Sequence, residues 1–380
     1  MGSQCAVHAP KALITEKFED PQLMTEKTNK HITYRAAILI LFIVLIGTVV
    51  ISFILGRYPI TPSELFGILF SKLTETVTRV LRFFGINVSW KVKQFWESRQ
   101  ELVMFSIRMP RIFMACLVGC SLSAAGAAYQ GVFQNPMAAP DILGASSGAA
   151  FGAALAILLG LGSKMVTLLA FVFSISAVFL VIFISRRAKG KQVLGLILSG
   201  IMMGSLFSSG TSFIKLVADP ADQLPAITYW LMGSLNGVKK GDLLFALITM
   251  AVGLIPLFIL RWRINVLTLG DDEARTIGVN AGRLRFIVII CSTLVTAASV
   301  SVSGMIGWVG LVIPHLARRI VGNNYKYLMP AAMLLGAIFL LLVDNVSRNL
   351  LATEIPIGIL TAFIGAPFFI YLITKGGEKY

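Results

Sequence analysis

The sequence predicts an all-α, polytopic membrane protein with about ten transmembrane helices and both termini in the cytoplasm. Composition is the first observation: 56% of the 380 residues are hydrophobic, only 13% are charged, and the mean hydropathy is +0.82. An ordinary soluble domain has about 25% charged residues. The other two observations are a series of long apolar runs and the placement of basic residues between them. Together they exclude a soluble globular protein.

The apolar runs are long enough to cross a bilayer, which takes about 20 helical residues. Five lie in the first part of the chain, at 36–55, 112–129, 142–161, 166–184 and 193–216. Five more lie at 243–260, 286–302, 305–316, 328–343 and 357–373. The run that begins at Met305 is short and interrupted by glycine, so the count carries a margin of about one or two.

Basic residues account for the net charge of +15. Alternate crossings place most of them on one side, which the positive-inside rule assigns to the cytoplasm. These residues are Lys27, Lys30, Arg35, Arg186, Arg187, Lys189, Lys191, Arg261, Arg263, Arg283, Arg285, Arg318, Arg319, Lys326 and Lys375. The charge therefore indicates a membrane lipid partner and not a nucleic acid. The segment 57–111 is the exception, since it is basic yet falls outside.

We expect one transmembrane domain over 36–375, between a polar cytoplasmic tail at 1–35 and a short one at 376–380. The extracellular insert 58–107 repeats apolar residues at helical spacing, among them Leu65, Ile68, Leu69 and Leu73. This pattern predicts amphipathic helices on the outer face. A plain helical cover over the bundle is an equal alternative to a recognition role.

A polar helix is predicted at 269–278, between two apolar spans. Its residues of interest are Leu269, Gly270, Asp271, Asp272, Glu273, Ala274, Arg275 and Gly278. The acidic residues suit the positive end of a first helical turn, and Gly278 suits the left-handed position after the last turn. Such a helix is typical of a docking element that receives force from a soluble partner.

Two further patterns concern the membrane interior. Asn135, Pro136 and Pro140 break any helix between the second and third spans, which predicts a re-entrant turn. The fifth span is rich in hydroxyl groups and predicts an aqueous path; for each hydroxyl singly, a bond to its own helix backbone is an equal alternative. The residues that we assign to the path are Asn135, Pro136, Ser199, Ser205, Ser208 and Ser209.

Charged residues mark the outer ends of two spans. Arg108 and Arg111 can bind carboxylates in bidentate fashion, although an isolated pair more often contacts lipid headgroups. Asp344 and Arg348 share a helix face, and Glu354 follows. Charges at this depth are functional candidates, with a local ion pair as the rival interpretation.

The chain offers little for catalysis or metal binding. It has no G-x-x-x-x-G-K-[ST] motif, so it cannot be the ATPase. Its four cysteines form no metal or disulfide pattern. Of three histidines, only His315 lies within the membrane domain. We therefore expect no catalytic residue, no metal site and no cofactor bound by this chain.

Five motifs in order resemble the permease subunits of ABC importers for iron–siderophores, haem and cobalamin. They are Arg108-Met109-Pro110-Arg111, Asn135-Pro136-Met137-Ala138-Ala139-Pro140-Asp141-Ile142-Leu143-Gly144, Leu269-Gly270 with Ala274-Arg275 and Gly278, Gly310-Leu311-Val312-Ile313-Pro314-His315, and Glu354-Ile355-Pro356-Ile357-Gly358. The similarity runs from Arg35 to Lys375. The long insert and the N-terminal tail depart from the family pattern.

The resemblance implies ten-helix subunits paired as a homodimer, or with a sister permease, around a central path. It implies two cytoplasmic ATPase subunits, which hold the ATP and magnesium and seat the helix at 269–278. It also implies an extracellular binding protein whose glutamates pair with Arg108, Arg111 and Arg348. Among cargoes we favour a ferric siderophore, with haem and cobalamin as alternatives.

Two other classes fit the residues less well. A gradient-driven carrier needs charged residues inside its spans and broken inverted repeats, and mid-span charge is scarce here. An intramembrane enzyme needs a clustered nucleophile, base or metal set, which the sequence does not suggest.

Overall fold

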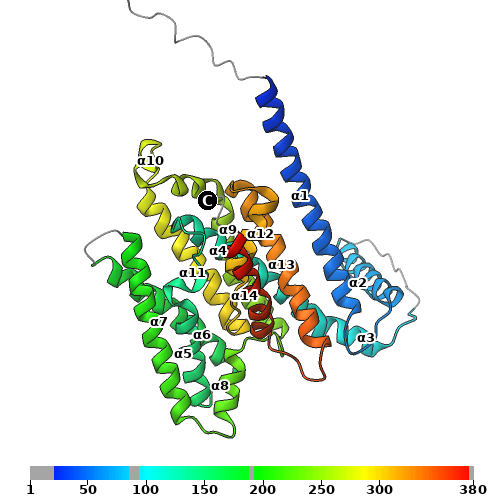
Figure 1. Ribbon diagram of the computed structural model, residues 1–380. Coiled ribbons are helices and arrows are strands. Elements are labelled where there is room, and N and C mark those ends of the chain that lie inside the picture. Colours follow the sequence, from blue (N-terminus) through cyan, green and yellow to red (C-terminus); the bar gives the residue numbers. More distant parts are fainter. Residues whose placement is uncertain (1–20, 85–93, 188–191, 376–380) are drawn as a thin grey trace, which may run out of the picture.

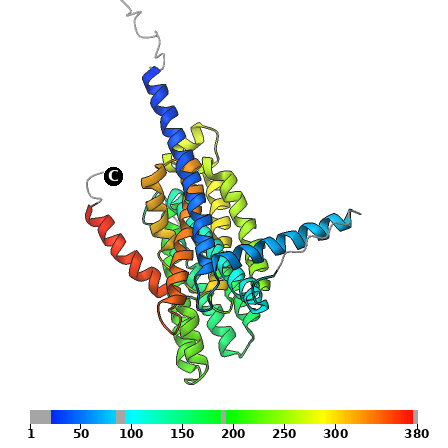
Figure 2. The ribbon, with the colours of Figure 1, turned by 90° about the vertical axis from the view of Figure 1, so that its right-hand side faces the viewer.

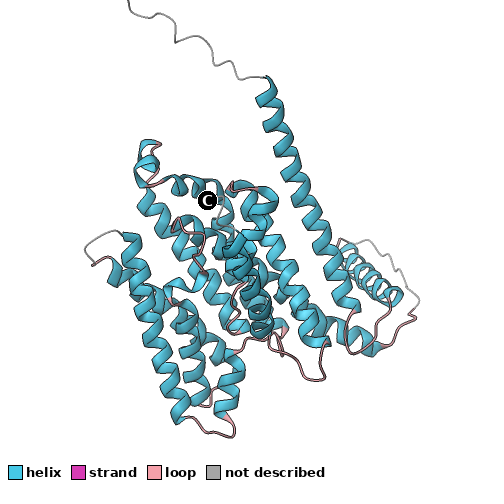
Figure 3. Cartoon of the chain, in the orientation of Figure 1, coloured by secondary structure: helices cyan, strands magenta, loops and turns pink. Residues whose placement is uncertain are grey.

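The computed structural model describes residues 21–84, 94–187 and 192–375. Every regular element in these ranges is a helix (Figure 3). The first part of the chain forms α1 (Pro21–Ile54), α2 (Pro62–Phe83), α3 (Ser98–Val103), a π-helical turn (Met104–Arg108) and α4 (Met109–Val132). A 3₁₀ turn (Pro140–Leu143) then leads to α5 (Ala145–Leu158), α6 (Ser163–Ser185) and α7 (Gln192–Val217). The second part forms α8 (Gln223–Leu231), α9 (Lys240–Leu269), α10 (Asp271–Thr276), α11 (Ala281–Ser303), α12 (Val309–Val321), α13 (Tyr325–Asn349) and α14 (Ile357–Lys375).

Seven of the described helices are long and apolar enough to cross a membrane. They are Ile32–Ile54 of α1, Ser98–Val132 with α4, α6, Val193–Val217 of α7, α9, α11 and α13. Two shorter apolar helices, at Ala145–Leu158 and Ile357–Tyr371, lie where spans are predicted. The chain is thus a multi-pass membrane protein, and the ten-crossing topology stays a prediction.

The bundle has two distinct ends. Figure 1 places α10 and the first turns of α1 at one end, and α2, α3 and α8 toward the other. In Figure 2 the last turn of α14 also points to the α10 end. We call these the α10 end and the α2 end. The described chain therefore begins and finishes at the same end.

Close helix contacts at glycine hold the centre of the bundle together. Gly119 of α4 faces Gly336 of α13, and Gly126 of α4 faces Gly310 of α12. A Cβ on Gly126 would lie 1.8 Å from the carbonyl oxygen of Gly310. No side chain fits at this distance, so the position requires glycine unless the helices separate. Small residues let helix backbones approach where lipid gives no hydrophobic drive for association. Helix α4 is the central element, with 78% of its most apolar window buried.

Two glycines four residues apart pack α5 against its neighbour α6. A Cβ on Gly152 would lie 2.4 Å from the carbonyl oxygen of Leu169, and one on Gly148 would lie 2.6 Å from that of Phe173. Both contacts are between backbones. The spacing of these glycines therefore lets the two helices approach closely.

Three features of the fold differ from the predicted segments. Helix α1 begins at Pro21, so the last part of the predicted polar tail is helical. The eighth predicted run starts at Met305, but α12 begins only at Val309, because residues 304–308 form a loop with Trp308 at a φ of +70°. Helix α8 was not predicted, because its nine residues fall below the length that a membrane span needs.

Candidate coupling and translocation sites

The predicted polar helix is present as α10, a short exposed helix of six residues between α9 and α11. Ala274 is fully buried and fixes the turn against the bundle. Asp272 and Arg275 form a loose ion pair of 3.8 Å on the side of α10 that faces away from the bundle. Their side chains are 93% and 75% exposed. The turn thus presents polar groups beyond the bundle while one methyl group anchors it.

Glycines set both boundaries of α10. Gly270 has a φ of +125° and Gly278 a φ of +79°, a region that residues with a Cβ rarely adopt. The amide of Gly278 donates to the carbonyl of Arg275 over 3.0 Å, which closes the last turn. The predicted left-handed residue after the helix is confirmed.

Two exposed apolar side chains flank this turn. Leu269 and Ile277 are each 60% exposed at the α10 end. The predicted helix 269–278 includes both residues, but of the two only Leu269 was assigned to the coupling site. Exposed apolar groups beside a polar turn are typical of an interface core with a polar rim.

The loop after α4 is tied to the last turn of α9 and to the middle of α12. The Gln134 side-chain amide donates to the carbonyl of Leu267 over 2.6 Å, two residues before α9 ends. His315 Nε2 of α12 lies 2.9 Å from the carbonyl oxygen of Pro136. Since a carbonyl only accepts, Nε2 carries the proton. The predicted turn is thus connected to the helix that leads into α10.

Asn135 and Pro136 both lie exposed in this loop. The Asn135 side-chain oxygen accepts from the amide of Met137 over 2.8 Å, which forms a tight side-chain turn. Gln134 has a φ of +50°, unusual for a residue with a side chain. Sequence reasoning missed Gln134, although it stands directly before the predicted pair.

The serines of α7 divide into two groups. Ser199 is buried, whereas Ser205, Ser208 and Ser209 are exposed along the helix. The hydroxyl of Ser212 donates to the Ser208 carbonyl over 3.0 Å, as the alternative interpretation expects for single hydroxyls. The path assignment stays a prediction for all four, and Ser199 is placed inside the bundle.

A buried ion cluster joins α1, α4 and α13 at the α2 end of the bundle. Arg111 Nε donates to Asp344 Oδ1 over 2.9 Å, and Arg111 Nη1 donates to both carboxylate oxygens of Glu354 over 2.9 Å. Arg348 Nη2 donates to the Ser52 carbonyl over 2.9 Å, and its Nε lies 3.7 Å from Asp344 Oδ2. The local ion pair that was the rival interpretation for Asp344 and Arg348 is present.

The three predicted docking arginines all face inward here. Arg108, Arg111 and Arg348 are 4%, 7% and 7% exposed. Arg108 donates to the backbone carbonyls of Phe53 and Tyr58, and so fixes the turn after α1. The structure brings the three guanidinium groups to one end of the bundle, and their pairing with an external protein stays a prediction.

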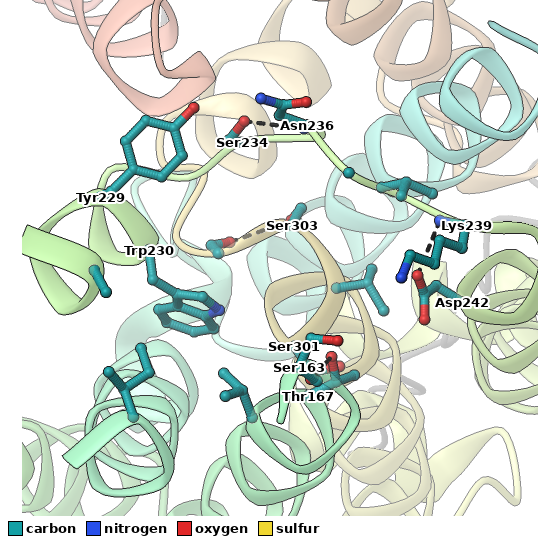
Figure 4. A pocket seen from close by; sticks show the side chains of 17 residues that line it. Ser163, Thr167, Tyr229, Trp230, Ser234, Asn236, Lys239, Asp242, Ser301 and Ser303 are labelled. Carbon is teal, nitrogen blue, oxygen red and sulfur yellow. Dashed lines mark hydrogen bonds between the residues drawn. The ribbon is translucent and has the colours of Figure 1, made fainter. Parts of the chain in front are cut away.

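A cavity with several polar side chains in its lining, which the sequence does not predict, lies at the α2 end. It encloses about 370 Å³ between α6, α8, the start of α9 and the end of α11. Figure 4 shows Tyr229, Trp230 and Ser234 on one side of it and Lys239 with Asp242 on the other. Asp242 accepts from the Lys239 amide over 2.9 Å and caps α9. The unpredicted α8 supplies Ala226, Tyr229 and Trp230 to its wall.

The fold defines a multi-pass membrane protein with an exposed polar turn at one end. Residues 40–375 match the sequence pattern of the FecCD transport family. The chain belongs to this family, whose members are permease subunits of ABC importers.

Two relatives and one solved structure span most of the chain. It is 38% identical over 340 residues to the molybdate import system permease protein MolB of Haemophilus influenzae, covering 89% of this chain and 96% of that one. It is 42% identical over 278 residues to a probable iron chelatin transport system permease protein of Helicobacter pylori, and this match covers 73% of this chain and 84% of the relative. A solved inward-facing metal-chelate type ABC transporter matches with a TM-score of 0.76 and 38% identity, over 89% and 98% of the two chains.

Proposed function

We propose that this permease carries a ferric siderophore inward across the cytoplasmic membrane of a prokaryote, driven by ATP that separate subunits hydrolyse. The observation that carries the proposal is α10, an exposed turn fixed by Ala274 and closed by Gly278. It lies between Arg263 near the end of α9 and Arg283 near the start of α11, basic residues that the positive-inside rule assigns to the cytoplasmic side. Cytoplasmic ATPase subunits would therefore meet α10 first.

A displacement of α10 would reach the loop after α4 through α9 and one hydrogen bond. Helix α9 leads directly into the turn, and Gln134 joins the carbonyl of Leu267 to the loop that holds Asn135 and Pro136. A shift of α9 would therefore move this loop with it. Only contacts that differ between outward and inward states can transmit the work of ATP hydrolysis.

A second permease copy fits the exposed apolar surface near α14. Phe363 and Ile370 are 75% and 63% exposed on this helix. Beside Phe363 lies an apolar hollow of about 670 Å³, which Met232 and Met305 also line. We infer a homodimer with a central path, served outside by a binding protein. The permease itself would bind no cofactor, since ATP and magnesium belong to the ATPase.

The choice of a ferric siderophore as cargo is supported by the chemical class that the similar proteins are named for. The relative from Helicobacter pylori is named for iron chelatin, and the matching structure is of metal-chelate type. A chelated metal brings its own ligands and needs none from the protein. Haem and cobalamin satisfy the same requirement, and molybdate enters the comparison through the Haemophilus influenzae relative.

Cargo-stimulated ATPase activity in proteoliposomes tests the proposal. The permease is reconstituted with its ATPase and binding protein and is offered ferric siderophores, haem, cobalamin and molybdate in turn. We expect ferric siderophores alone to stimulate hydrolysis and to accumulate inside. Stimulation by another cargo would overturn the siderophore assignment, and failure of the ATPase to associate would overturn the importer itself.

A further inference from the structure

Helix α2 carries an exposed apolar stripe along one side. Its members are Phe66, Leu69, Phe70, Leu73 and Val80, which are 40–60% exposed. At 3.6 residues per turn they fall within about 100° of the helix circumference. The opposite side carries Glu64, Ser71, Glu75, Arg79 and Arg82. The stripe is therefore a continuous surface and not a scatter of single residues.

Helix α2 leaves the bundle sideways. Figure 2 shows it projecting at a steep angle to α1 from the α2 end of the molecule. Its anchor is the segment that leads into α4. Lys72 Nζ lies 2.8 Å from Glu101 Oε1 of α3, and the pKa of Lys72 is raised by its hydrogen bonds to Glu101 and Glu75. The outer part of α2 packs against little of the bundle.

The stripe points away from this anchor. Gly67 lies against Phe95 and Trp96, where a Cβ would come within 2.6 Å of the Phe95 ring. Gly67 and Lys72 lie about 110° from the centre of the stripe, one on each flank, so both face away from it by helical geometry. In Figures 1 and 2, α3 lies farther from the α10 end than α2 does. The stripe therefore faces back toward the level of the spanning helices.

The length of the α1 span places α2 where the edge of the hydrocarbon layer is expected. The span Ile32–Ile54 has 23 residues, or about 34 Å at 1.5 Å per residue, which matches a hydrocarbon core of about 30 Å. Only 17% of its most apolar window is buried, so lipid surrounds much of α1. Helix α2 starts at Pro62, just beyond the end of that span. Its stripe continues the lipid-facing surface of α1 at the boundary.

We propose that α2 is an in-plane membrane anchor, with its apolar stripe in the acyl region of the outer leaflet and Arg79 and Arg82 at the lipid phosphates. Amphipathic helices with these two faces bind the bilayer in this way. The lipid surface holds α2 and, through α3, the outer end of α4. Only the choice of leaflet rests on the proposed function.

Spin-label accessibility in nanodiscs of phosphatidylethanolamine and phosphatidylglycerol tests this proposal. The full chain, with Cys5, Cys116, Cys120 and Cys291 replaced by alanine, receives one nitroxide through Leu73→Cys, Val80→Cys or the control Arg82→Cys. Oxygen dissolves in the acyl region, whereas a charge-neutral nickel complex stays in water. We expect the ratio of oxygen to nickel accessibility at Leu73 and Val80 to exceed that at Arg82 severalfold.

Two results would overturn the proposal. Equal nickel accessibility at all three positions would show α2 in solvent. Protection of Leu73 and Val80 from both reagents would show that a protein surface covers the stripe, such as a second copy or a binding protein. Phe66→Cys replaces any variant that fails to assemble in nanodiscs. The measurement uses the permease alone, so a failure of the transport proposal leaves its outcome unaffected.

Discussion

Asp344 Oδ1 lies 2.9 Å from Arg111 Nε, although the two residues are 233 positions apart in the chain. Asp344 is fully buried and also faces Arg348, so one carboxylate compensates two guanidinium groups. Glu354 supplies the second negative charge. This cluster fastens α4 to α13 at the α2 end of the bundle.

Asp344→Ala should destabilise the permease strongly. Removal of one partner from a buried pair leaves uncompensated charge, which typically costs about 3–5 kcal/mol. The midpoint of thermal unfolding in detergent should fall markedly. Asp272→Ala is the control, because its pair with Arg275 is exposed and loose. Equal midpoints for the two variants would contradict a structural role for the cluster.

Gly126→Ala should also lower the unfolding midpoint. A Cβ at this position would lie 1.8 Å from the Gly310 carbonyl oxygen, so α4 and α12 must separate. Overpacking of this kind typically costs about 1–3 kcal/mol. Gly47→Ala on α1 serves as the matched control, since nothing lies within 4 Å of its added Cβ. If both variants keep the wild-type midpoint, the close contact is not essential.

Gln134→Glu should reduce transport more than ATPase binding. The substitution preserves size but replaces the NH₂ donor with a second acceptor, which repels the Leu267 carbonyl. The loop with Pro136 would then no longer follow α9. We would measure cargo uptake and ATPase affinity side by side, with Met137→Ala as an exposed control in the same loop. Normal uptake by Gln134→Glu would rule out this connection.

Leu269→Ala and Ile277→Ala should weaken binding of the ATPase subunit. Both side chains are exposed beside α10, where apolar groups would fill the centre of an interface. Each truncation should cost about 1–2 kcal/mol, or roughly tenfold in affinity. Surface-captured permease and soluble ATPase give this affinity directly. Unchanged affinity in both variants would move the docking surface away from α10.

Local patterns in the sequence predicted much of the fold. Apolar runs located the long helices, and Gly278 located the boundary of α10, because each signal lies within a few residues. Helix α8 escaped prediction because nine residues carry no membrane-span signal. The start of α12 was placed too early because the backbone conformation of Trp308 depends on its tertiary surroundings.

The candidate sites were predictable only where chemistry and sequence position coincide. The coupling turn is contiguous, so its residues could be named from the sequence. The partners of Arg111 could not, because Asp344 and Glu354 reach it from a distant part of the chain. The sequence analysis assigned Arg108, Arg111 and Arg348 to an external partner. In the structure, Arg111 donates hydrogen bonds to the carboxylates of Asp344 and Glu354. Gln134 was missed because its acceptor is a backbone carbonyl, which no sequence pattern reveals.

The number of cargo molecules imported per ATP hydrolysed, measured for Gly278→Pro in reconstituted proteoliposomes, tests the central claim most directly. Proline cannot adopt the φ of +79° at this position and lacks the amide that donates to Arg275. Gly282→Ala, near the start of α11, is the matched control, since only the Asn280 side chain lies near its added Cβ. We predict that Gly278→Pro inserts normally and hydrolyses ATP with little or no import, while Gly282→Ala keeps the wild-type ratio. A wild-type ratio in Gly278→Pro would contradict the role of α10 as the coupling element.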